Sequence, residues 1–135
     1  MRKILLLAAA AAALLCLASC GKMLDRVDDY VISFEIQGHI EDEDNLAILQ
    51  AYFDEHYLGP NDTFTYHGNQ YDARIKAEAF FEERWALIDR ELILSCINDE
   101  DDIIYLLCIM SGDKTKEIVN YVYWDYTLKE SLATE

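Results

Sequence analysis

This 135-residue chain has two runs of four consecutive carboxylates, one at 41–44, where a helix is expected to begin, and one formed by Asp99, Glu100, Asp101 and Asp102. Clustered carboxylate oxygens are the ligands that Ca²⁺ prefers. The second run lacks the glycine and the distal glutamate of an EF-hand loop, and runs of acidic residues are usually solvated. We therefore expect an exposed turn, with these four residues as weak candidates for a metal site, and we predict no cofactor.

Residue types that could support catalysis or zinc binding are present, but not in functional patterns. His39, His56 and His67 are scattered, and the chain has no Cys-x-x-Cys pair, no Gly-x-Ser-x-Gly and no Gly-rich phosphate loop. Cys96 and Cys108 lie in apolar runs, where burial makes a thiol unreactive. We expect a protein that is not an enzyme. A hydrolase with paired carboxylates is the least favoured alternative.

Aromatic residues are the better candidates for binding. The segment NYVYWDY contains Tyr121, Tyr123, Trp124 and Tyr126, and we expect Tyr105 on the neighbouring strand, diagonal to Trp124. Aromatic side chains suit protein interfaces and flat sugar rings alike. They are also common in strands that close a core. These five residues form the candidate binding patch, and an exposed Trp124–Tyr105 pair would indicate a binding role.

The first nineteen residues have the layout of an export signal. Arg2 and Lys3 precede an apolar run at 4–17, which ends at Ala18 and Ser19. A basic start, a short apolar segment and small residues at a cleavage site are typical of a secretory signal peptide. The run is shorter than the roughly 18 residues that indicate a membrane span. We predict a signal peptide at 1–19.

The motif Leu17-Ala18-Ser19-Cys20 resembles the lipobox of bacterial lipoprotein precursors. In that family the cysteine thiol receives a diacylglyceryl group and a peptidase cuts before the cysteine. The resemblance implies that Cys20 is the lipidated first residue of a mature envelope protein; Cys16 lacks the small preceding residue. Acyl chains contribute about 0.8 kcal/mol per buried methylene, so several chains anchor durably. We favour the outer membrane and leave open whether the protein faces the periplasm or the cell surface.

The charge of the chain excludes one class of partner. Asp and Glu number 26 against 11 Lys and Arg, which gives a net charge of −15. Nucleic-acid binding requires a basic surface, so we expect no nucleic-acid partner. The length suits a single core. We expect a lipidated tether at 20–29, one domain at 30–127 and a C-terminal tail at 128–135.

Hydrophobic patterning predicts an α+β fold. Alternating apolar residues from Tyr30 to Ile36 indicate a half-buried strand, and helical spacing predicts helices at about 43–58 and 73–88. DTFTYHGNQY suggests a small hairpin between the helices. ELILSCI, DIIYLLCIM and EIVNYVYWDYT are separated by turn segments and predict a three-stranded antiparallel meander, with the helices on one sheet face.

The register of this meander has two consequences. Pairing Met110 with Glu117 would place Cys108 opposite Val119, and Cys96 would share a sheet face with Cys108 without being its cross-strand partner. We therefore expect two buried free thiols. Both faces of the predicted sheet are largely apolar, unlike a sheet with one solvated face. The helices should cover one face, and the N-terminal strand region, a partner or a ligand should cover the other.

These patterns favour a non-catalytic binding or scaffolding lipoprotein that presents a sheet face to another envelope protein. The alternative is an accessory lipoprotein that binds a glycan or peptide through the aromatic patch. An open apolar sheet face would favour the first hypothesis. A concave pocket lined by aromatic and a few polar groups would favour the second.

Overall fold

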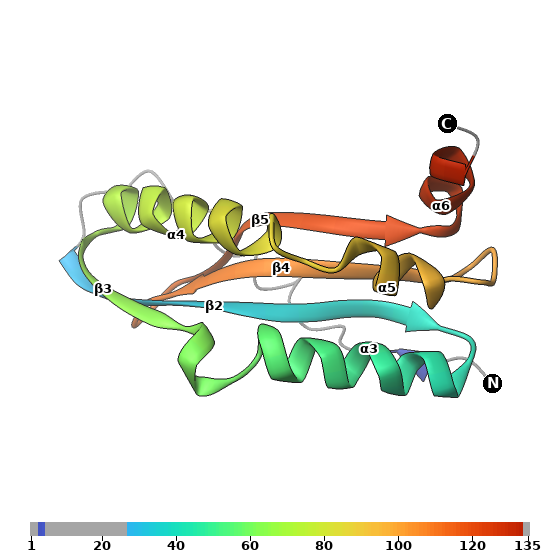
Figure 1. Ribbon diagram of the computed structural model, residues 1–135. Helices are drawn as coiled ribbons and strands as arrows, with labels where there is room; N and C mark the ends of the chain where they lie inside the picture. The colour runs from blue at the N-terminus through green and yellow to red at the C-terminus, as the bar shows by residue number, and fades with distance from the viewer. Residues whose placement is uncertain (1–2, 5–26, 134–135) are drawn as a thin grey trace.

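The computed structural model describes residues 3–4 and 27–133. The strands are β1 (Lys3–Ile4), β2 (Val27–Ile40), β3 (Phe64–Asn69), β4 (Ile103–Ser111) and β5 (Lys116–Asp125). The helices are α3 (Glu43–His56), the 3-10 turn η1 (Pro60–Asp62), α4 (Gln70–Trp85), α5 (Arg90–Ser95) and α6 (Tyr126–Ala133). Every strand pairing is antiparallel, which confirms the predicted α+β class (Figure 1).

The long strand β2 lies inside the sheet. Its residues 31–39 pair with β4 along one edge, and its residues 27–32 pair with β3 along the other. The two-residue β1 pairs with β2 at Ile40 and His39. Since β5 pairs with β4, the sheet runs from β1 and β3 through β2 and β4 to β5. The N-terminal strand therefore extends the sheet and does not cover its face.

The predicted three-stranded meander is wrong in its first strand, because ELILSCI forms α5 and its C-terminal cap. Ile93, Cys96 and Ile97 are buried at the i, i+3, i+4 spacing of a helix. The Asp89 side chain accepts a hydrogen bond from the Leu92 N–H and caps the helix. A short apolar run fits the period of a strand and that of a helix equally well. In the structure β2 pairs with β4 at the position where the predicted meander placed ELILSCI.

A single large core lies between one face of the sheet and the helices. Figure 1 shows α3, α4 and α5 running along the strands. The predicted alternation in β2 and the helical stripes of α3 and α4 are confirmed by burial. The core includes Tyr30, Ile32, Phe34 and Ile36 of β2, Leu49 and Phe53 of α3, Ala77 and Phe81 of α4, and Ile104, Leu106, Cys108 and Met110 of β4.

The segment expected to form a small hairpin pairs with β2 instead. β3 ends at Asn69, whose Oδ1 accepts a hydrogen bond from the Asp72 N–H at 2.7 Å. Asn69 is therefore the N-cap of α4, which begins at Gln70. Capping by the residue that ends β3 allows strand and helix to follow each other without a loop.

The two ends of the predicted domain also differ from expectation. β2 begins at Val27, within the expected tether, and α6 includes residues 128–133 of the expected tail, with Leu128 packed against the core. Cys20 and the signal peptide, apart from Lys3–Ile4, lie outside the described residues. Within residues 3–4 and 27–133, no helix is long and apolar enough to cross a membrane.

Candidate functional site

One irregularity in β5 decides which of its side chains face outward. Met110 pairs with Glu117, as the turn predicted. The register then shifts, so that Val119 is an extra residue between Ile118 and Asn120. A one-residue bulge sends every later side chain to the opposite face from the one an unbroken register gives.

The bulge places two tyrosines on the sheet face opposite the helices, so the predicted register is wrong beyond it. Cys108 pairs with Asn120, and Tyr105 on β4 pairs with Tyr123. The Tyr105 ring centroid lies 6.1 Å from that of Tyr121 and 5.7 Å from that of Tyr123, within the range of aromatic contacts. Tyr121 is 54% exposed and Tyr123 is 45% exposed. We call Tyr105, Tyr121 and Tyr123 the tyrosine face.

Apolar and charged groups adjoin the tyrosine face. Leu107 and Ile109 are buried on this side of the sheet, with Tyr105 and Ile118 packed against them. Lys116 Nζ lies 3.1 Å from Glu35 Oε1. Aromatic rings beside a buried apolar centre and a charged margin are the arrangement found in protein interfaces.

The other two aromatic candidates lie elsewhere. Trp124 is 3% exposed and belongs to the core opposite Ile104, so the expected Trp124–Tyr105 pair is not formed. Tyr126 begins α6 and packs partly against the core. A side-chain hydrogen bond with Glu130, together with nearby acidic charges, raises the pKa of Tyr126.

The four acidic residues 99–102 occupy the turn before β4. The Asp102 side chain is buried, and its carboxylate accepts hydrogen bonds from the backbone N–H groups of Glu41 at 2.9 Å, Asn98 at 3.0 Å and Asp99 at 3.0 Å. Glu100 and Asp101 are exposed. In the described part of the chain, no three His, Cys, Asp or Glu side chains are arranged to hold a metal ion. The geometry gives Asp102 a structural role.

Cys96 and Cys108 are buried free thiols, as expected, although Cys96 caps a helix and does not lie on a strand. Cys108 Sγ donates to the Ala77 carbonyl oxygen at 3.6 Å, and burial raises the pKa of Cys108 to about 12. Burial also raises the pKa of Cys96. Reactive cysteines need an accessible, easily ionised thiol, and these two have the opposite surroundings.

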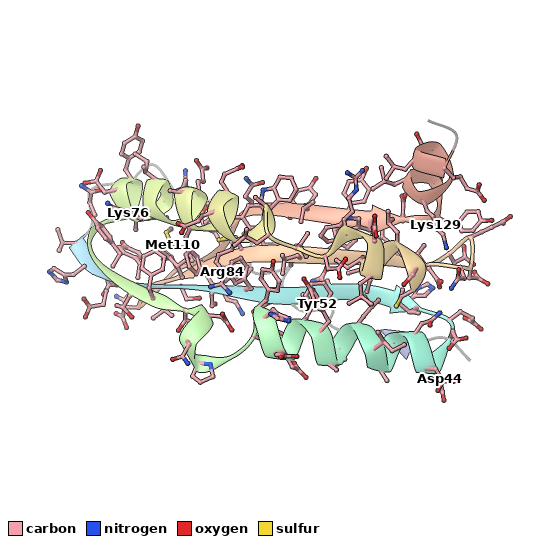
Figure 2. The ribbon with its side chains drawn as sticks, viewed as in Figure 1. Asp44, Tyr52, Lys76, Arg84, Met110 and Lys129 are labelled. Carbon is pink, nitrogen blue, oxygen red and sulfur yellow. The ribbon has the colours of Figure 1, made fainter. Side chains whose placement is uncertain are left out.

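A cleft that the sequence did not predict lies between α3 and the end of α4. Its volume is about 360 Å³, and its lining is Tyr52, His56, Tyr57, Arg84, Leu87 and Asp89. Figure 2 shows the labelled side chains of Tyr52 on α3 and Arg84 on α4 in the space between these helices. The Tyr52 hydroxyl accepts a hydrogen bond from the Asp89 N–H at 2.8 Å.

Arg84 connects several of the segments around this cleft. Its Nη2 donates to Asp62 Oδ1 and to the His56 carbonyl oxygen, both at 2.5 Å. Its guanidinium carbon lies 5.4 Å from the Tyr57 ring centroid, within cation–π range. The Tyr57 hydroxyl donates to the Arg84 carbonyl oxygen at 2.9 Å, and burial is the main cause that raises the pKa of Tyr57 to about 12.

Sequence reasoning missed the cleft because no local motif marks it. Arg84 and Asp62 are 22 residues apart, and each belongs to a different element. The only sequence signal is an arginine among aromatic residues, which is common on helices. Compared with protein families, with curated proteins and with solved structures, the chain shows no match.

Proposed function

We propose that this chain is a lipoprotein of the bacterial cell envelope whose domain binds another envelope protein without catalysing a reaction. The observation that carries the proposal is the exposure of Tyr121 and Tyr123 beside Tyr105, on the sheet face opposite the helices. Tyrosine side chains provide large contact areas at low entropic cost and are enriched among the residues that dominate binding.

The membrane anchor in this proposal rests on the lipobox resemblance at Leu17-Ala18-Ser19-Cys20. Val27, where β2 begins, follows Cys20 closely in the chain. A lipid on Cys20 would therefore hold the sheet near a membrane, where the partner would be another resident of the envelope. The net charge of −15 keeps the domain apart from anionic headgroups.

Crosslinking in the native envelope, followed by mass spectrometry, tests the tyrosine face. The double variant Tyr121→Ala, Tyr123→Ala should reduce partner capture at least about tenfold, because central tyrosines often contribute more than 1.4 kcal/mol. Tyr71→Ala is the matched control, since Tyr71 is 57% exposed but lies on α4. Undiminished capture by the double variant with an unchanged unfolding midpoint would refute the proposal.

The cleft at Arg84 supports a second candidate function, which is binding of a small glycan. Its volume of about 360 Å³ falls within the roughly 300–1,000 Å³ of small-molecule sites, and its lining combines aromatic rings with polar groups. Titration with mono- and disaccharides should then shift the NMR signals of Tyr52 and His56 and leave those of Tyr121 unchanged. Saccharide-induced shifts at Tyr121 alone would exclude the cleft as the site.

A further inference from the structure

The outer edge of β5 directs backbone groups away from β4. Among the described strands, β4 is the partner of β5, and no strand pairs with its other side. The Tyr121 N–H donates to the side-chain Oδ1 of Asn120 at 2.8 Å, so it points away from β4. Antiparallel residues alternate between facing one neighbouring strand and facing the other, so Tyr123 also directs its N–H and C=O outward. Such an edge is a template for a further strand.

The hairpin between β4 and β5 gives the same alternation independently. The Gly112 N–H donates to the Thr115 carbonyl oxygen at 2.8 Å, which makes this a hydrogen-bonded pair. Counting back along β4 by twos from Gly112 reaches Cys108 and Leu106, whose partners on β5 are Asn120 and Val122. The residues that bond β4 are therefore Asn120 and Val122, and Tyr121 and Tyr123 face the free edge.

A small apolar hollow borders this edge on the helix side of the sheet. Its volume is about 230 Å³. Its lining is mainly apolar and consists of Trp85, Ile88, Val122, Tyr123, Trp124 and Leu128, with the charged Arg90 beside them. The volume is below the roughly 300–1,000 Å³ of small-molecule sites, so the hollow suits one side chain better than a whole ligand. β5 thus offers an apolar hollow on one face and two tyrosines on the other.

We propose that β5 binds an extended segment of a partner protein as an added strand, with one large aliphatic side chain of that segment in the hollow. The added strand would bond to the outward N–H and C=O of Tyr123, and its alternate side chains would contact Tyr121 and Tyr123 on the opposite face. This inference rests on the proposed function and names how the partner is held.

The net charge of this chain indicates which residues the bound segment should carry. The chain has a net charge of −15, which attracts a segment that carries basic residues. The same charge makes a second copy of this chain a poor occupant, because two such chains repel each other. A basic segment that contains a large aliphatic residue is therefore the occupant to which the structure points.

The test uses the full chain, purified in detergent, and a fluorescein-labelled peptide of alternating threonine and lysine with one central leucine. Tyr123→Pro and Tyr123→Ala both lack the tyrosine ring, but only Tyr123→Pro lacks the outward N–H. Proline is tolerated on an edge strand where its nitrogen faces outward, so the β4–β5 pairing should persist. Anisotropy should show at least tenfold weaker binding to Tyr123→Pro than to Tyr123→Ala.

Two further peptides are tested for binding to the wild-type chain, so a folding defect of a variant cannot account for their results. Methylating the backbone nitrogens of the probe should abolish binding, and replacing its leucine by alanine should weaken binding at least about tenfold. Equal binding to both Tyr123 variants, or binding of the methylated probe, overturns strand addition. If the wild-type chain forms dimers that Tyr123→Pro dissociates, and does not bind the peptide, the occupant of the β5 edge is a second copy of this chain. Binding of a partner segment is then wrong.

These results separate the inference from the proposed function. If the Tyr121→Ala, Tyr123→Ala variant loses envelope crosslinks while the peptide tests fail, the tyrosine face binds a partner by another geometry and strand addition is wrong. If the peptide tests succeed while those crosslinks persist, β5 accepts strands and the proposed function of the tyrosine face is wrong.

Discussion

At the scale of single residues, the Asp102 carboxylate illustrates how an acidic cluster can be structural. One oxygen accepts from the Glu41 N–H, which follows β2, and the other accepts from the N–H groups of Asn98 and Asp99. Hydrogen bonds to a charged acceptor are stronger than those between neutral groups. Lys129 Nζ further donates to the Asn98 side chain at 2.8 Å. Asp102 therefore connects the turn before β4 to the end of β2.

Asp102→Ala should lower the free energy of unfolding by about 2–4 kcal/mol. The substitution leaves three backbone donors without their acceptor, and each buried unsatisfied group costs about 1–3 kcal/mol, part of which water recovers. Urea denaturation measures the change. Glu100→Ala is the control, because Glu100 is exposed in the same turn and should change stability by no more than about 0.5 kcal/mol. Equal effects of the two substitutions would contradict this role for Asp102.

At the scale of elements, two departures from regular structure shape the sheet. The bulge at Val119 turns Tyr121 outward and Trp124 into the core. In β2, Gly38 has φ +129°, and a Cβ there would overlap the carbonyl oxygen of Ile103 on β4. A side chain rarely adopts this φ, so only glycine allows β2 to stay paired with β4 at this point.

Gly38→Ala should destabilise the domain by at least about 2 kcal/mol, since the unfavourable φ and the overlap with backbone act together. Thermal unfolding monitored by circular dichroism would show the loss. Gly59→Ala provides the comparison. Gly59 has φ −81°, and its nearest foreign atom would be a side-chain oxygen of Asp62 at 3.1 Å, so its cost should stay below about 1 kcal/mol. A tolerated Gly38→Ala would show that β2 can shift away from β4 there.

At the scale of the whole molecule, the proposed anchor and the strong negative charge set how the domain meets its surroundings. The net charge of −15 disfavours contact with anionic lipids and nucleic acids. A lipid would then supply the membrane attachment that the surface charge opposes. In the part of the chain that the structure describes, α3, α4 and α5 pack on one side of the sheet, and Tyr121 and Tyr123 are exposed on the other.

Cys20→Ala should abolish incorporation of an alkyne-labelled fatty acid and release the protein from the membrane fraction. The reason is that the thiol at position 20 is the proposed acyl acceptor. Cys16→Ala is the matched control and should retain both label and membrane association. In-gel fluorescence and ultracentrifugation measure the two properties, and a labelled Cys20→Ala protein would overturn the anchor assignment.

Much of the fold could be predicted where local pattern and burial agree. The alternation in β2 and the stripes of α3 and α4 follow from the periods of strands and helices, which depend only on local geometry. ELILSCI is predicted as a strand and forms a helix, because a short apolar run fits either period until its neighbours are known. The Arg84 cleft could not be predicted either, since its polar groups come from distant segments.

The sequence by itself determined the α+β class, the burial of Cys96 and Cys108, and the presence of a tyrosine-rich last strand, because composition and periodicity record which residues avoid water. Only the tertiary structure decided that β2 pairs with β4, that Trp124 is core and that Tyr121 and Tyr123 face outward. The physical reason is the two-residue period of a strand. The extra residue Val119 moves every later side chain of β5 to the opposite face of the sheet. No local pattern in the sequence shows where such a bulge will form.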